Sequence, residues 1–154
     1  MKVLAPEPIE LVDDDSTSPA NDGFAVVRAQ VTDCTIVTGE EGCKFAVWKV
    51  TLVLQPHDDT RCRTTISLFK RYSQFRRLHD QLVQRCREAG LPAQLPQLPP
   101  RVSWYRSWRY QEANLDRSWL ARRRQGLDYF VNKILLDQSL VNAHRELIEE
   151  FLER

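Results

Sequence analysis

The chain has 154 residues, of which 42% are hydrophobic and 28% are charged, and its formal net charge is +1. This length and hydrophobic content predict one globular domain with its own core and leave little room for a second. No run of 18 apolar residues occurs, and the N-terminus lacks the basic-then-apolar pattern of a secretion signal. We therefore expect a soluble protein made in the cytosol.

The small net charge conceals an uneven distribution along the chain. Residues 1–22 hold one lysine against six acidic residues, a net charge of −5, whereas residues 69–124 hold 13 basic against four acidic residues, a net charge of +9. In the second region the basic residues stand among aromatic residues and prolines. Such a mixture favours a polyanionic surface as the binding partner over a merely solvated face.

Residues 1–22 are typical of a flexible acidic tail, because they contain three prolines and show no sustained hydrophobic period. Within this tail, Pro6 and Pro8 form a Pro-x-Pro motif inside an apolar island at residues 4–11. Prolines stiffen a segment and lower the entropy lost on binding, so the island can serve as a short linear docking motif. The alternative is a linker with no function of its own.

Three β-strands are predicted next, over residues 24–37, 45–55 and 61–70, with turns at 39–42 and 56–59. The residues expected on their inward faces are Val27, Ala29 and Val31 in the first, Ala46, Trp48, Val50, Leu52 and Leu54 in the second, and Thr64, Ile66 and Leu68 in the third. Consecutive strands joined by short turns predict an antiparallel meander, whose inward face must be covered by the helices that follow.

A helical region follows the strands. The first helix is expected over Ser73–Glu88, with Ser73 as its N-cap, and Gly90 followed by Pro92 ends it. The proline-dense segment 91–101 then predicts an extended, polyproline-like loop.

A second helix is expected to begin near Arg117, and a last helix or pair of helices lies within Ser139–Leu152. The apolar stripe of the second helix is Leu127, Phe130, Val131, Ile134 and Leu135, and the last helices contribute Leu147, Ile148, Phe151 and Leu152. The complete order predicts an α+β fold, in which a three-stranded antiparallel β-meander is followed by a helical subdomain with a proline-rich loop.

Arg71 and Tyr72 stand where the two-residue period of a strand changes to the period of a helix. Side chains at such a junction are held rigidly and still reach solvent. A guanidinium grips phosphate through a bidentate fork, and a tyrosine ring packs against the apolar face of another ring. This pair therefore suits a phosphate group attached to a ring.

No catalytic or metal-binding pattern is evident in the globular part of the sequence. The four cysteines, Cys34, Cys43, Cys62 and Cys86, form no Cys-x-x-Cys pair, and the histidines, His57, His79 and His144, are scattered. We expect free buried thiols, surface histidines, no metal and no cofactor. Without a Ser-His-Asp or Cys-His pairing, a phosphate-loop glycine pattern or clustered carboxylates, we expect no enzyme.

Residues 23–154 resemble the phox-homology (PX) domain family. Three motifs carry the resemblance: Arg-Tyr-x-x-Phe at 71–75, Pro-x-x-Pro-x-basic at 96–101, and Arg-Arg-x-x-Leu at 123–127. Such domains typically bind phosphatidylinositol 3-phosphate on endosomal or vacuolar membranes, so the resemblance implies a lipid-binding targeting module.

The resemblance also implies a role for particular residues. Arg71 would hold the 3-phosphate, Tyr72 would pack under the inositol ring, Arg101 would meet the 1-phosphate and Arg123 would hydrogen-bond the 4- and 5-hydroxyls. The position of Arg101 is commonly lysine in the family, which leaves the headgroup less well defined than the membrane role.

The aromatic residues divide into a membrane group and a core group. The family's membrane-inserting loop corresponds to residues 102–110 here, which contribute Val102, Trp104, Tyr105 and Trp108. The alternative for Trp104 and Trp108 is packing on the domain's own flank. Trp48 and Trp119 are expected in the core, Lys70 is expected at the periphery, and Arg122 and Arg124 are expected to attract anionic lipid non-specifically.

The layout is similar to that of small fungal endosome-and-vacuole PX adaptors. In these proteins an N-terminal Pro-x-Pro motif, here Pro6-Glu7-Pro8, recruits a bridge-like lipid-transfer protein to membrane contact sites. The resemblance implies a peripheral protein of endosome and vacuole membranes that takes part in protein transport.

Two other functions compete with this interpretation. Residues Pro96–Arg101 fit the Pro-x-x-Pro-x-Arg pattern of an SH3-domain ligand, which would make the protein a scaffold. Alternatively, Trp104, Tyr105, Trp108 and Tyr110 could stack on the bases of a single-stranded nucleic acid. Neither function gives Arg71 and Tyr72 a role, and we therefore expect no nucleic-acid partner.

Overall fold

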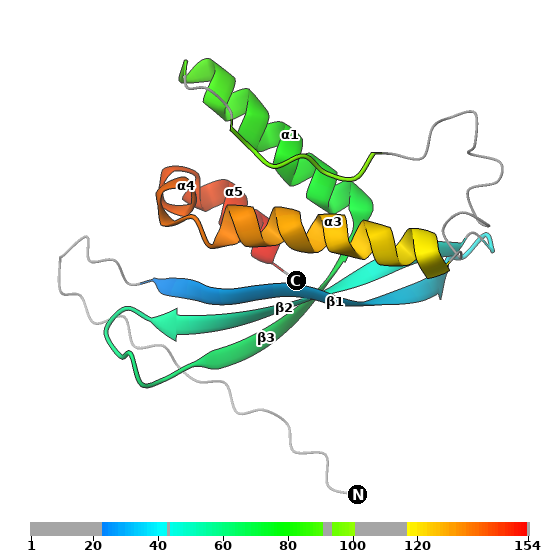
Figure 1. Ribbon diagram of the computed structural model, residues 1–154, viewed down its shortest axis with the longest axis horizontal. Helices are drawn as coiled ribbons and strands as arrows, with labels where there is room; N and C mark the ends of the chain where they lie inside the picture. Colours follow the sequence, from blue (N-terminus) through cyan, green and yellow to red (C-terminus); the bar gives the residue numbers. More distant parts are fainter. Residues whose placement is uncertain (1–22, 43, 91–93, 101–116, 154) are drawn as a thin grey trace, which may run out of the picture.

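Figure 1 shows the computed structural model of the chain, which describes residues 23–42, 44–90, 94–100 and 117–153. The elements in chain order are β1 (Phe24–Thr38), β2 (Lys44–Pro56), β3 (Thr64–Arg71), α1 (Tyr72–Glu88), α3 (Arg117–Leu135), α4 (Gln138–Ala143) and α5 (Arg145–Leu152). The strands form an antiparallel sheet in the order β1-β2-β3, and the helices lie on one face of it (Figure 1). The predicted α+β fold is confirmed. No helix in the described ranges is both long enough and apolar enough to cross a bilayer.

The sheet follows the predicted alternation in β2 and departs from it in β1. Trp48, Val50 and Leu52 are buried, and Ala46 and Leu54 are half-buried against the core. In β1 the register shifts between Val26 and Arg28, so that Val26 is buried and Val27 is 38% exposed. A bulge adds one residue to a strand and moves later side chains to the other face. The inward placement predicted for Val27 is therefore wrong, and Thr64, at the exposed start of β3, was also misplaced.

The helices supply the cover that the sheet requires. The buried apolar residues that they contribute are Phe75, Leu78, Leu82 and Cys86 from α1, Leu127, Phe130, Val131, Ile134 and Leu135 from α3, and Leu147, Ile148 and Phe151 from α5. The predicted stripe of α3 is confirmed in full. Burial of these side chains contributes about 1.5–3 kcal/mol each and is the main stabilising term of the domain.

Helix α3 is also tied to the free edge of β1 by side-chain hydrogen bonds. The Val31 N–H donates to Asp128 Oδ1 at 2.7 Å, and Arg124 Nη1 donates to the Val31 carbonyl at 2.9 Å. These bonds satisfy backbone groups that an edge strand would otherwise expose. Arg124 therefore has a structural role that the sequence did not indicate, and its attraction to anionic lipid stays a prediction.

Helix α1 begins one residue before its predicted start, and its N-cap lies two residues before the predicted one. Arg71 is the N-cap, with extended backbone angles of φ −84° and ψ 157°, and Ser73 lies within the first turn. The Arg71 N–H donates to Gln74 Oε1 at 2.9 Å, which is the half of a capping box that the N3 side chain supplies. At the other end Gly90 has φ +67° and follows the C-cap Ala89, so the predicted helix end is confirmed.

One histidine lies deeper than predicted. His144, at the junction of α4 and α5, is 9% exposed, and its Nε2 lies 3.9 Å from Cys86 Sγ. The expectation of a surface histidine is wrong here because the short helices fold His144 against α1. Of the described cysteines Cys86 is buried, Cys34 is half-buried and Cys62 is exposed, and all three are free thiols.

Candidate headgroup site

A pocket of about 100 Å³ opens where the start of β2 and the end of β3 meet the start of α1 and the first half of α3. Its lining residues are Phe45, Ala46, Trp48, Arg71, Tyr72, Ser73 and Arg123, and we call it the junction pocket. The pocket thus brings together three residues that are predicted to bind a headgroup, Arg71, Tyr72 and Arg123. Arg123 is far from the other two in sequence.

Arg71 provides an exposed cation at the edge of the junction pocket. Its guanidinium carbon lies 4.1 Å from the centroid of the Phe45 ring, a cation–π contact that restrains the side chain. Within the described ranges no carboxylate forms an ion pair with it. The charge is therefore available to an anionic ligand.

Phe45 is a pocket residue that the sequence did not reveal. The β2–β3 register pairs Val47 with Arg71, and Phe45 lies two residues further along the same face of β2. Diagonal neighbours on one face of a sheet are close enough for long side chains to touch. Only the register brings the two residues together, and no local pattern could have indicated it.

Arg123 forms the inner wall of the pocket and is only 6% exposed. Its guanidinium carbon lies 3.9 Å from the Tyr72 ring centroid and 4.3 Å from the Trp119 ring centroid. Its Nη2 donates to the Pro100 carbonyl at 2.8 Å. Trp119 is half-buried beside Arg123, so its predicted place in the core is wrong; the i, i+4 spacing of the two residues was the signal for this contact.

Tyr72 connects the pocket to the proline-rich segment at residues 94–100. Its hydroxyl donates to the Pro99 carbonyl and accepts a hydrogen bond from Arg76 Nη2 at 2.5 Å. Arg76 stands four residues after Tyr72, so helical spacing again places the partners together. The ring is held by its hydroxyl at one end and by stacking against Arg123 on its face.

The proline-rich segment is built into the domain. Leu98 is 8% exposed and belongs to the core, and the carbonyls of Pro99 and Pro100 accept hydrogen bonds from the helices. An SH3 domain needs a polyproline helix that is free to enter its aromatic groove. Here the segment would first have to leave its place, which disfavours the scaffold alternative.

The sequence and the fold of this chain were compared with those of known proteins. Residues 59–154 match the family described as PX domain. The chain belongs to the PX-domain family. Among solved structures, a designed CISK-PX domain is 27% identical, with a TM-score of 0.61 over 82% of this chain and 99% of that one. The mouse SNX19 PX domain with bound sulphate ion, 13% identical with a TM-score of 0.60, shares the fold over 84% of this chain and 97% of that one.

Relatives that match almost the whole chain are named endosomal/vacuolar adapter protein YPT35. The protein of that name from Saccharomyces cerevisiae (strain YJM789) is 37% identical, over 97% of this chain and 94% of its own length. The one from Candida glabrata is 42% identical, again over 97% of this chain and 94% of its own length. The predicted similarity to fungal endosome-and-vacuole PX adaptors is confirmed.

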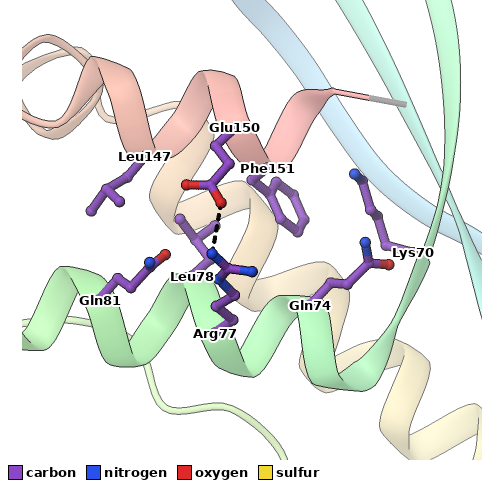
Figure 2. A pocket seen from close by; sticks show the side chains of 8 residues that line it. All are labelled: Lys70, Gln74, Arg77, Leu78, Gln81, Leu147, Glu150 and Phe151. Atoms are coloured by element: carbon purple, nitrogen blue, oxygen red, sulfur yellow. Dashed lines mark ion pairs between the residues drawn. The ribbon is translucent and has the colours of Figure 1, made fainter.

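The PX domain has a second pocket between α1 and α5, and Lys70 lines it (Figure 2). The predicted peripheral position of Lys70 is wrong, because the residue is buried. Lys70 is 4% exposed, and its Nζ donates to the Glu153 carbonyl at 2.5 Å. Burial lowers the pKa of the Lys70 ammonium, although the charge of Glu153 acts in the opposite direction. Lys70 does point away from Arg71, but that face of β3 is the buried one. Arg77 and Glu150 form an ion pair at 2.9 Å beside this pocket (Figure 2).

The remaining predicted site residues lie outside the described residues. They are Arg101 of the headgroup set, Val102, Trp104, Tyr105 and Trp108 of the insertion loop, and Pro6 and Pro8 of the tail.

Proposed function

We propose that this PX domain binds phosphatidylinositol 3-phosphate and thereby acts as a membrane-targeting adaptor on endosomes and the vacuole. The observation that carries the proposal is the junction pocket, where Arg71, an exposed cation with no acidic partner in the described ranges, adjoins Tyr72 and Arg123. The adapter names of the relatives support the membranes named in it.

The chemistry of the pocket suits a phosphorylated ring. A phosphomonoester carries about −1.5 to −2 charges, and each charge-assisted hydrogen bond to it contributes roughly 1.5–3 kcal/mol. In this proposal Arg71 holds the 3-phosphate, Tyr72 lies against the inositol ring and Arg123 donates to the 4- and 5-hydroxyls. Arg101 follows Pro100 directly and would meet the 1-phosphate.

Vesicle binding tests the proposal directly. Vesicles of equal net charge would carry phosphatidylinositol 3-phosphate, phosphatidylinositol 4-phosphate, phosphatidylinositol 4,5-bisphosphate or phosphatidylserine alone, and a single-stranded oligonucleotide would be measured beside them. We expect selective binding to the 3-phosphate lipid at physiological salt. Equal binding to all four vesicles would reduce the function to charge attraction, and tighter binding to the oligonucleotide would favour the nucleic-acid alternative.

The aromatic loop should add membrane insertion to headgroup recognition. Tryptophan settles at the membrane interface, so Trp104→Ala with Trp108→Ala should weaken vesicle binding about tenfold and spare binding of soluble inositol 1,3-bisphosphate. Surface plasmon resonance and calorimetry measure the two affinities. A similar loss in both, or a lower melting temperature, would instead support packing of the tryptophans on the domain.

The division of the chain into a tail at residues 1–22 and a domain at 23–154 also makes a prediction. Pro6→Ala with Pro8→Ala keeps the charge of the tail and should leave phosphatidylinositol 3-phosphate binding unchanged. It should remove recruitment of a protein partner, which we propose to be a bridge-like lipid-transfer protein, because the island loses its stiffness and its proline surface. Immunoprecipitation followed by mass spectrometry compares the partners. An identical partner set would make the tail a linker only.

A further inference from the structure

Three hydrogen bonds join the Tyr72 hydroxyl, the Arg76 guanidinium and the Pro99 carbonyl. The chemistry of these groups determines which of them donates in each bond. Arginine can only donate, so the Tyr72 hydroxyl must accept from Arg76 Nη2 and direct its own single proton to the Pro99 carbonyl. Arg76 Nη2 also lies 3.4 Å from the same carbonyl. Arg76 therefore determines how the Tyr72 hydroxyl is used, although it does not itself line the junction pocket.

The next carbonyl along the proline segment is held from the opposite side. Arg123 Nη2 of α3 donates to the Pro100 carbonyl at 2.8 Å, while Tyr72 and Arg76 of α1 hold the Pro99 carbonyl. Proline has no N–H and a fixed φ, so these carbonyls are the only backbone groups of the dipeptide that can bond. Both are engaged by residues that line the junction pocket.

Gly126 of α3 makes the close approach of Pro99 possible. A Cβ at this position would overlap Pro99 Cγ and lie 3.1 Å from Pro99 Cδ. The proline ring is closed onto its backbone and cannot swing aside as a flexible side chain would. Glycine is also one of the poorest residues for the interior of a helix, so packing against Pro99 gives this position a specific reason for glycine.

From these contacts we infer that Arg76 and Gly126 are positioning residues of the headgroup site. Acting through Pro99, they hold the Tyr72 ring and the Arg123 guanidinium in mutual contact at 3.9 Å, and so preserve two walls of the junction pocket. The inference rests on the proposed function, which assigns a phosphorylated headgroup to the junction pocket as its ligand. It adds two residues that do not touch that ligand.

Gly126→Ala provides the first test, with Pro99→Ala as the matched second change. Gly126→Ala alone should weaken binding to phosphatidylinositol 3-phosphate vesicles about tenfold and lower the melting temperature. Pro99→Ala removes Cγ and Cδ and leaves a Cβ that would lie 3.5 Å from the new methyl group, an ordinary contact. In that background Gly126→Ala should raise the melting temperature, because alanine favours a helix, and should no longer weaken binding.

Arg76→Met provides the second test, with Arg77→Met as its control. Both changes remove one positive charge from α1, but the Arg77 side chain is 68% exposed and pairs with Glu150, away from the proline segment. We expect Arg76→Met to weaken binding about tenfold relative to Arg77→Met at a temperature where both are folded. Binding to phosphatidylserine vesicles should remain equal in the two variants.

The outcomes separate the inference from the proposed function. Wild-type protein without preference for any phosphoinositide would refute the proposed function and this inference with it. If wild-type protein is selective but Arg76→Met equals Arg77→Met, or Gly126→Ala has the same effect with and without Pro99, the positioning role is wrong and the proposed function stands. If Gly126→Ala alone does not fold, the positioning role is tested by two other measurements. These are the comparison of Arg76→Met with Arg77→Met and the binding of the Pro99→Ala, Gly126→Ala double variant.

Discussion

Arg71→Ala is expected to lower affinity for phosphatidylinositol 3-phosphate vesicles at least a hundredfold while the melting temperature stays close to that of the wild type. The Arg71 side chain is exposed and forms no ion pair within the described ranges, and α1 is capped through its backbone N–H. The substitution should therefore change the stability of the fold little. In the proposed site, binding would lose a bidentate, charge-assisted contact with the 3-phosphate, and a hundredfold change corresponds to about 2.7 kcal/mol.

Two further variants separate the guanidinium fork from its charge. Arg71→Lys keeps the charge but loses the planar fork that stacks on Phe45, so its affinity should fall between those of Arg71→Ala and wild type. Arg122→Ala removes the same charge from an exposed position on α3 and should change affinity only a few-fold. Wild-type affinity in a well-folded Arg71→Ala protein would refute the assignment of Arg71 to the 3-phosphate.

Arg123→Gln is expected to weaken phosphoinositide binding between tenfold and a hundredfold and also to destabilise the domain. The substitution removes stacking against Tyr72 and Trp119 together with the hydrogen bond to the Pro100 carbonyl. Loss of this part-buried, charge-assisted hydrogen bond costs about 1.5–3 kcal/mol of unfolding free energy. Urea denaturation and vesicle sedimentation measure the two effects separately.

The neighbouring arginine is a matched control for this prediction. Arg124 also donates to a backbone carbonyl, that of Val31, at 2.9 Å, but it does not line the junction pocket. Arg124→Gln should therefore destabilise the domain to a similar extent and leave affinity near that of the wild type below the melting transition. Equal losses of affinity in the two variants would show that Arg123 acts through stability alone.

Features that depend on short spacing along the chain could be predicted from the amino-acid sequence alone. The inward face of β2 and the stripe of α3 follow from two-residue and helical periods, which reflect which side chains share a face. The junction of Arg71 and Tyr72 was visible because the period changes there. Even two missed contacts, those of Tyr72 with Arg76 and of Trp119 with Arg123, have the i, i+4 spacing of helix neighbours.

How these segments meet in space could be seen only in the folded domain. Strand register brings Phe45 beside Arg71, a bulge turns Val27 outward, and the close approach of Pro99 requires glycine at position 126. Lys70 belongs to this group as well, since alternation places it opposite Arg71 but only the docking of α5 buries it. Each outcome depends on the packing of elements that are distant along the chain. Local periodicity cannot encode such packing, because it reports which face a residue is on and not what covers that face.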